Sequence, residues 1–91
     1  MPYIHPADRQ QYEPIIASLV AAMAGREPRQ ALGDLNYVVF AAVRRYLDDG
    51  RMTYANASAL LGTMDCCRME IYRRLIAPYE DTKRQEHGDA V

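Results

Sequence analysis

Arginine and tyrosine side chains gather in one short run near the end of the chain. The run from Met69 to Glu80, MEIYRRLIAPYE, holds two tyrosines, two adjacent arginines and two glutamates within about three helical turns. Arginine makes bidentate contacts with carboxylates and phosphates and stacks on aromatic rings, so this mixture suits an anionic or planar ligand. Glu70 precedes the arginines by three and four residues, the spacing of ion pairs along a helix, so a purely structural role is the competing interpretation.

A second group of candidate residues lies in the middle of the chain. Arg44 and Arg45 stand late in a predicted helix, and four arginines would line one pocket if this helix packed beside the one carrying the C-terminal run. Asn36 and Tyr37 fall in its predicted first turn, where Asn36 either supports the cap or forms a polar recognition corner with free backbone N–H groups. The candidate ligand-binding residues are therefore Asn36, Tyr37, Arg44, Tyr72, Arg73, Arg74, Tyr79 and Glu80.

The sequence offers no constellation typical of catalysis, and we predict no catalytic residue, metal or cofactor. His5 and His87 lie at opposite ends of the chain without a ligand partner at metal-binding spacing. Cys66 and Cys67 are neighbours whose side chains point about 100° apart on a helix, so they do not suggest a disulfide. No glycine-rich phosphate loop or nucleophile motif occurs. An enzyme is therefore disfavoured.

Helical periodicity and turn residues define the elements that position these side chains. Residues 1–7 read as an extended arm, and residues 8–12 as a short helical turn. A helix beginning at Pro14 runs to Ala24 and stops at Gly25, with a polar connection over residues 26–32.

The next predicted helix is capped by Asp34 and ends at Asp48, Asp49 and Gly50. Thr53 caps a third helix, in which Gly62 suggests a close helix approach. Pro78 kinks this helix or starts a new one through about Glu86, and residues 88–91 form a frayed tail.

These elements predict an all-α fold, a single domain over residues 1–91 built as a small bundle of three to four helices. The third helix carries one apolar face for the core and a second stripe at the spacing of a helix-packing seam. The second stripe favours a homodimer or a larger homo-oligomer. Its residues are Met69, Tyr72, Ile76 and Tyr79.

Composition narrows the classes of protein. The formal net charge is −1, and a general nucleic-acid binder needs an excess of basic residues, so nucleic-acid binding is disfavoured. No apolar run reaches 18 residues, and the N-terminus does not resemble a secretory signal, so we expect a cytoplasmic protein without a membrane span.

Five short motifs follow one another along the chain: MPYI at the start, GDLNY from Gly33, EIYRR from Glu70, APYED from Ala77 and the final HGDAV. This ordered set resembles a small family of bacterial, prophage and phage proteins of about 90 residues. The family has no assigned function. The resemblance spans nearly the whole chain and is weakest over residues 12–32. It implies a compact helical protein and a mobile-element origin, and it supplies no catalytic residues.

Four functional hypotheses follow from these features. The first is a non-enzymatic homo-oligomer that captures a small anionic, nucleotide-like ligand, as a counter-defence sponge. The second is a protein–protein inhibitor or adaptor that uses the arginine- and tyrosine-rich helix face on a host protein. The third is a small enzyme that acts on a nucleotide or phosphoester, with Glu70 or Glu80 as its base and an arginine clamp. A helix-turn-helix DNA binder is the fourth, and the net charge disfavours it.

Overall fold

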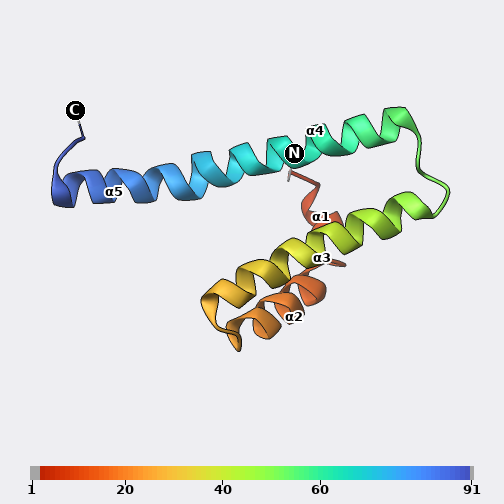
Figure 1. Ribbon diagram of the computed structural model, residues 1–91, viewed down its shortest axis with the longest axis horizontal. Helices are drawn as coiled ribbons and strands as arrows, with labels where there is room; N and C mark the ends of the chain where they lie inside the picture. The colour runs from red at the N-terminus through yellow and green to blue at the C-terminus, as the bar shows by residue number, and fades with distance from the viewer. Residues whose placement is uncertain (1–2, 91) are drawn as a thin grey trace. The chain divides into compact units, whose positions relative to one another are not determined.

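The computed structural model describes residues 3–90, and it is built from helices joined by short connections (Figure 1). They are α1 (Pro6–Arg9), α2 (Glu13–Ala24), α3 (Pro28–Asp48), α4 (Tyr54–Ile71), the π-helix η1 (Tyr72–Ile76) and α5 (Ala77–His87). The predicted all-α class and the long C-terminal helix are confirmed. Predictions for Met1, Pro2 and Val91 lie outside the described residues. Over residues 3–90, none of the helices is both long enough and apolar enough to cross a membrane.

The described chain divides into two units. The N-terminal unit is Tyr3–Tyr54, with α1, α2 and α3, and the C-terminal unit is residues 55–90, with nearly all of α4 followed by η1 and α5. The candidate residues are therefore shared between two units, and each unit is considered by itself.

The N-terminal arm is shorter than predicted. Helix α1 already begins at Pro6, two residues before the predicted helical turn, and residues 10–12 form a turn. His5 lies just before this helix, and its Nδ1 accepts a hydrogen bond from the Ala7 amide at 3.1 Å. The Arg9 guanidinium donates to the Ile4 carbonyl at 2.9 Å. A histidine cap and a proline at the first helical position thus start the helix early.

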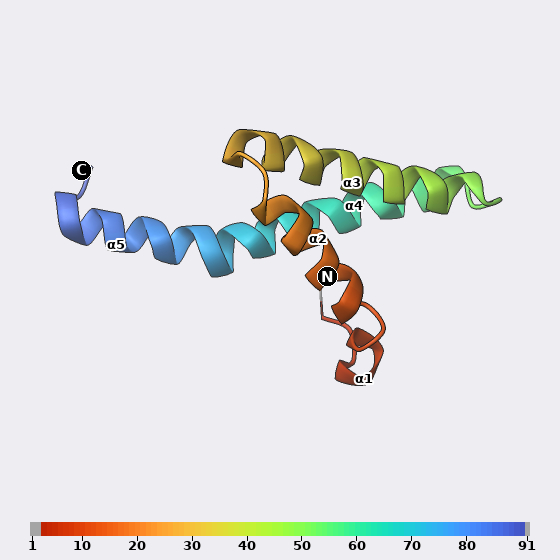
Figure 2. The same cartoon turned by 90° about the horizontal axis from the view of Figure 1, so that it is seen from below.

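The predicted start of α3 at Asp34 is wrong. Only Gly25–Glu27 separates α2 from α3, and the chain turns sharply there (Figure 2). Pro28 is the first residue of α3, a position where its missing N–H costs nothing. Asp34 lies inside the helix, where it accepts hydrogen bonds from Arg26 at 2.8 and 3.3 Å. The hydrogen bond to this carboxylate raises the pKa of the Arg26 guanidinium.

Helices α2 and α3 contact each other and give the N-terminal unit its modest core. The end of α2 at Gly25 and the end of α3 at Asp48 agree with the prediction, and Gly50 has the positive φ of 75° expected after a helix. Leu47 is 8% exposed, and it is the single buried apolar side chain of the described residues. The half-buried side chains of the pair include Leu19, Met23, Ala31 and Val38.

In the C-terminal unit, α4, η1 and α5 follow one another without interruption and make a helix of about 34 residues (Figure 1). Pro78 neither ends this helix nor leaves it regular. Pro78 has no N–H to donate and its ring clashes with the preceding turn, and the wider π turn occurs just before it. The Ala77 amide accordingly donates to the Tyr72 carbonyl, five residues back. Gly88, with a φ of 86°, follows the last residue of α5.

Candidate functional site

The eight predicted ligand-binding residues fall into two sets. One set lies on α3 of the N-terminal unit and consists of Asn36, Tyr37 and Arg44. The other lies on η1 and α5 of the C-terminal unit and consists of Tyr72, Arg73, Arg74, Tyr79 and Glu80. All eight residues are exposed.

The arginine pair of η1 is partly neutralised within its own helix. Arg73 Nη2 lies 2.7 Å from Glu70 Oε1, three residues earlier. The Glu70 side chain is only 16% exposed, whereas that of Arg73 is 71% exposed. The ion pair anticipated from the spacing is therefore formed, and Arg73 is not a freely available anion receptor.

A hydrogen bond joins Tyr72 to Glu80 across the π turn. The Tyr72 hydroxyl donates to Glu80 Oε1 at 2.7 Å, although the residues are eight positions apart. One π turn of about 4.4 residues followed by one α turn of 3.6 residues spans eight residues, so the two side chains align after two turns. The bond to Glu80 raises the pKa of Tyr72, with a further contribution from the carboxylate charge. Glu80 therefore favours the protonated form of the Tyr72 hydroxyl.

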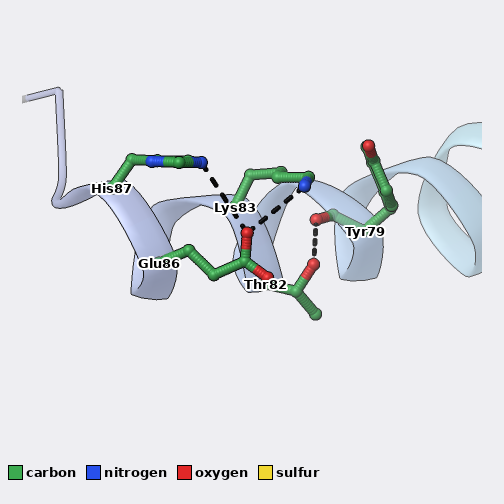
Figure 3. A network of polar contacts seen from close by, with 5 residues as sticks. All are labelled: Tyr79, Thr82, Lys83, Glu86 and His87. Carbon is green, nitrogen blue, oxygen red and sulfur yellow. Dashed lines mark hydrogen bonds and ion pairs between the residues drawn. The ribbon is translucent and has the colours of Figure 1, made fainter.

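Tyr79 belongs to a polar network along α5 (Figure 3). The Thr82 hydroxyl donates to the Tyr79 carbonyl at 2.6 Å, and the Lys83 ammonium lies 5.5 Å from the centre of the Tyr79 ring. Glu86 Oε2 accepts from Lys83 at 3.2 Å and lies 3.7 Å from His87 Nε2. These contacts are local and exposed, so they order the side chains along this helix.

The set on α3 has a different character, because here an open hollow of about 330 Å³ runs along the helix. Its size is at the low end for sites that hold small molecules. The aromatic rings of Tyr37 and Phe40 stand at one end, and they are 66% and 63% exposed. Charged side chains stand at the other end. The lining is Tyr37, Phe40, Ala41, Arg44, Arg45 and Asp48.

The two arginines of this hollow differ in their partners. Arg44 Nε lies 3.5 Å from Asp48 Oδ2, one turn later on the helix. Arg45 forms no hydrogen bond or ion pair within residues 3–90, so its donors face solvent. Two arginines against one aspartate leave the lining with a net positive charge of one. This α3 hollow therefore combines flat apolar rings with an available guanidinium, which suits a planar anion.

The prediction that Asn36 stands in the first turn of its helix, beside free backbone N–H groups, is wrong. Helix α3 begins at Pro28, eight residues before Asn36, so Asn36 stands in the helix interior and no free amides surround it. Asn36 also does not line the hollow, whereas its neighbour Tyr37 does. Ligand binding by Asn36 stays a prediction, and neither its place in the helix nor the lining of the hollow supports it.

Phe40, Ala41, Arg45 and Asp48 line the hollow but were not among the predicted ligand-binding residues. A signal for them exists in the sequence. Counting from Tyr37, the lining residues recur at steps of three and one, which is the spacing of one helix face.

Metal ligands do not come together in the described structure. Within residues 3–90, no three histidine, cysteine, aspartate or glutamate side chains form a potential metal site. Cys66 and Cys67 are free thiols, both half-buried.

Fold and site together define a small all-α protein whose candidate site is an arginine- and aromatic-lined helix face. The chain belongs to a family described as a domain of unknown function, DUF6899, whose match covers residues 1–90. No curated protein and no solved structure matches the chain. The family has no assigned activity, so a functional conclusion depends on the residues themselves.

Proposed function

We propose that this protein is a non-enzymatic binding protein that captures a small anionic, nucleotide-like ligand in the α3 hollow and acts as a homo-oligomer in the cytoplasm. The observation that carries this proposal is Arg45, whose guanidinium has no partner in residues 3–90 and stands beside two exposed rings. A nucleotide offers a planar base to stack and a phosphate to bind, which are the two chemistries that this lining supports.

The exposed apolar side chains support the homo-oligomer. Leu47 is the single buried apolar side chain of the described residues, while 22 large apolar side chains are exposed. A small domain gains little stability from such a core, and association with further copies would add the missing burial.

The biological setting is part of the proposal. The sequence motifs resemble a family of phage and prophage proteins, and a small protein that sequesters nucleotide signals would protect a phage from host defence. The role of a counter-defence sponge rests on this analogy with phage biology rather than on the fold.

Isothermal titration calorimetry against a panel of mononucleotides, dinucleotides and cyclic nucleotides tests the ligand. We expect micromolar binding of at least one member. Arg45→Ala should weaken it by about tenfold or more, because a charge-assisted hydrogen bond is lost. Arg29→Ala is the matched control, since it removes an exposed arginine of α3 that does not line the hollow. Binding no tighter than millimolar across the panel would refute the proposal.

A protein–protein adaptor is the second candidate, and the exposure of Phe40 favours it. An apolar ring that is 63% exposed beside an arginine is typical of residues that anchor interfaces. Affinity purification from the host should then recover one stoichiometric partner with the wild type and lose it with Phe40→Ala. Equal recovery by both proteins would exclude this face as the interface.

A further inference from the structure

One face of the long helix exposes a run of apolar side chains, which we call the pairing face: Leu61, Met69, Tyr72, Ile76 and Tyr79. Their exposures are 66%, 53%, 52%, 43% and 60%. Leu61 precedes Tyr72 by 11 residues, about three turns, so both lie on the same side of α4. A lone helix is only marginally stable in water, and its stability in proteins comes mainly from packing of its apolar face. The pairing face therefore requires a partner.

The area of the pairing face matches what a dimer requires. A side chain of this size that is half exposed presents on the order of 100 Å², so the five together present roughly 500 Å² per copy. A standard interface buries about 800 Å² per partner, of which about 60% is apolar, or roughly 500 Å².

The length of the helix favours a second copy of the same helix as the occupant. Helices α4, η1 and α5 together have about 34 residues and span about 51 Å. Leu61 and Lys83 are 22 residues apart, or about 33 Å, so the pairing face with its charged flank takes up the greater part of this helix. An identical helix matches it from end to end.

The charges on the two sides of the densest part of the pairing face, residues 69–79, favour an antiparallel arrangement. Asp65 lies one turn before Met69, and Lys83 lies one turn after Tyr79. Asp65 and Lys83 are each nine residues from Arg74, which is the midpoint of residues 69–79. A parallel pair in register would set Asp65 against Asp65 and Lys83 against Lys83. A two-fold axis at Arg74 sets Asp65 of each copy against Lys83 of the other.

We propose that α4, η1 and α5 pair antiparallel with the same helices of a second copy, about a two-fold axis at the π turn. This inference rests on the homo-oligomer of the proposed function and supplies its surface. The axis also brings Arg73 of the two copies toward each other. The ion pair of each Arg73 with its own Glu70, at 2.7 Å, lowers the repulsion at that point.

Light scattering coupled to gel filtration, at tens of micromolar, tests the pairing. The wild type should be a dimer. Ile76→Glu buries a charge next to the axis and should weaken association about 100-fold or more. Thr63→Glu is the matched control, because Thr63 is nine residues, or about two and a half turns, from Tyr72 and lies on the opposite side of α4. A monomeric wild type, or equal loss of association in both variants, would overturn the proposal.

Exchanging the charges of Asp65 and Lys83 tests whether the two helices run antiparallel. This test leaves the apolar side chains of the pairing face unchanged. Asp65→Lys and Lys83→Asp should each weaken the dimer about tenfold, because each sets like charges against each other. The double variant should associate at least about fivefold more tightly than either single variant, since the cross-chain pair is restored with its signs reversed. A double variant no tighter than the weaker single variant would rule out the antiparallel arrangement.

The same proteins separate this inference from the ligand proposal. The α3 hollow lies in the N-terminal unit, so nucleotide binding is measured independently on the wild type by calorimetry. A dimer that binds no nucleotide would leave the pairing intact and refute the ligand. A monomer that binds a nucleotide would refute the pairing and leave the ligand intact.

Discussion

Replacing Gly33 by alanine should stabilise the protein, because the structure places this glycine inside a helix. Gly33 is the sixth residue of α3, and it does not have a positive φ. A Cβ built on Gly33 would meet no heavy atom within 4 Å. Alanine loses less backbone entropy than glycine on folding, so Gly33→Ala should raise the free energy of unfolding by about 0.8–1.0 kcal/mol.

Gly62→Ala provides an independent second measurement on α4. Gly62 also stands in a helix interior, and a Cβ there would meet nothing within 4 Å. The two positions lie in different units, so the effects should add to about 2 kcal/mol in the double variant. For a domain of this size, each 1 kcal/mol corresponds to a rise in melting temperature of about 4–8 °C.

Gly50→Ala is the matched control of opposite sign. Gly50 has a φ of 75°, a conformation that costs a residue with a Cβ about 1–2 kcal/mol. Thermal unfolding followed by far-ultraviolet circular dichroism measures all four variants, the double variant included. The protein concentration is held equal, because association raises apparent stability.

Each glycine variant tests a separate conclusion. A neutral or destabilising Gly33→Ala would show that α3 begins near Asp34, as the sequence suggested, rather than at Pro28. A destabilising Gly62→Ala would show a closely packed neighbour at this position, which is the helix approach that the sequence suggested and the structure lacks among its described residues.

Three further predictions concern the C-terminal helix. Tyr72→Phe removes the hydrogen bond to Glu80, and because folding raises the pKa of Tyr72, this bond stabilises the protein below about pH 10 and is lost as the pH rises through the folded pKa. The difference in melting temperature between wild type and variant should therefore vanish above that pKa. A difference that did not change with pH would refute the bond. Tyr72→Ala should lower association in light scattering more than Arg84→Ala, which removes only exposed contacts to Asp81 and Asp89, and equal effects would exclude Tyr72 from the interface. Pro78→Ala allows a regular α-helix, in which residues eight positions apart point about 80° away from each other, so the bond between Tyr72 and Glu80 should break. The pKa of Tyr72, followed by NMR, should then fall toward 10. An unchanged pKa would show that the π turn does not depend on the proline.

The sequence predicted those boundaries that depend on one local residue. Gly25, Gly50 and Gly88 each follow the end of a helix as expected, because a glycine after a helix acts through its own backbone. The start of α3 was missed because Asp34 has the side chain of a cap. Its carboxylate instead binds Arg26, a partner eight residues away that propensity does not reveal.

In the candidate site, too, the contacts that follow from local sequence spacing were predictable and the others were not. The pairing of Glu70 with Arg73 was predictable from regular helical spacing, and the structure contains it. The bond between Tyr72 and Glu80 was not predictable, because it depends on a π turn that changes the spacing at which side chains align. The helical spacing of the sequence places Tyr37, Phe40, Ala41 and Arg44 on one face, but it does not show that this face is hollowed.

The π turn also determines where the long helix tolerates a change in length. Deleting one residue from a regular α-helix rotates everything beyond the deletion by about 100° and separates the faces on its two sides. A π turn already holds about one residue more than an α turn, so a deletion within Tyr72–Ile76, made together with Pro78→Ala so that an α turn can form, leaves α5 close to its original orientation. Single-residue deletions elsewhere between Tyr54 and His87 should therefore be far more damaging than one at this turn.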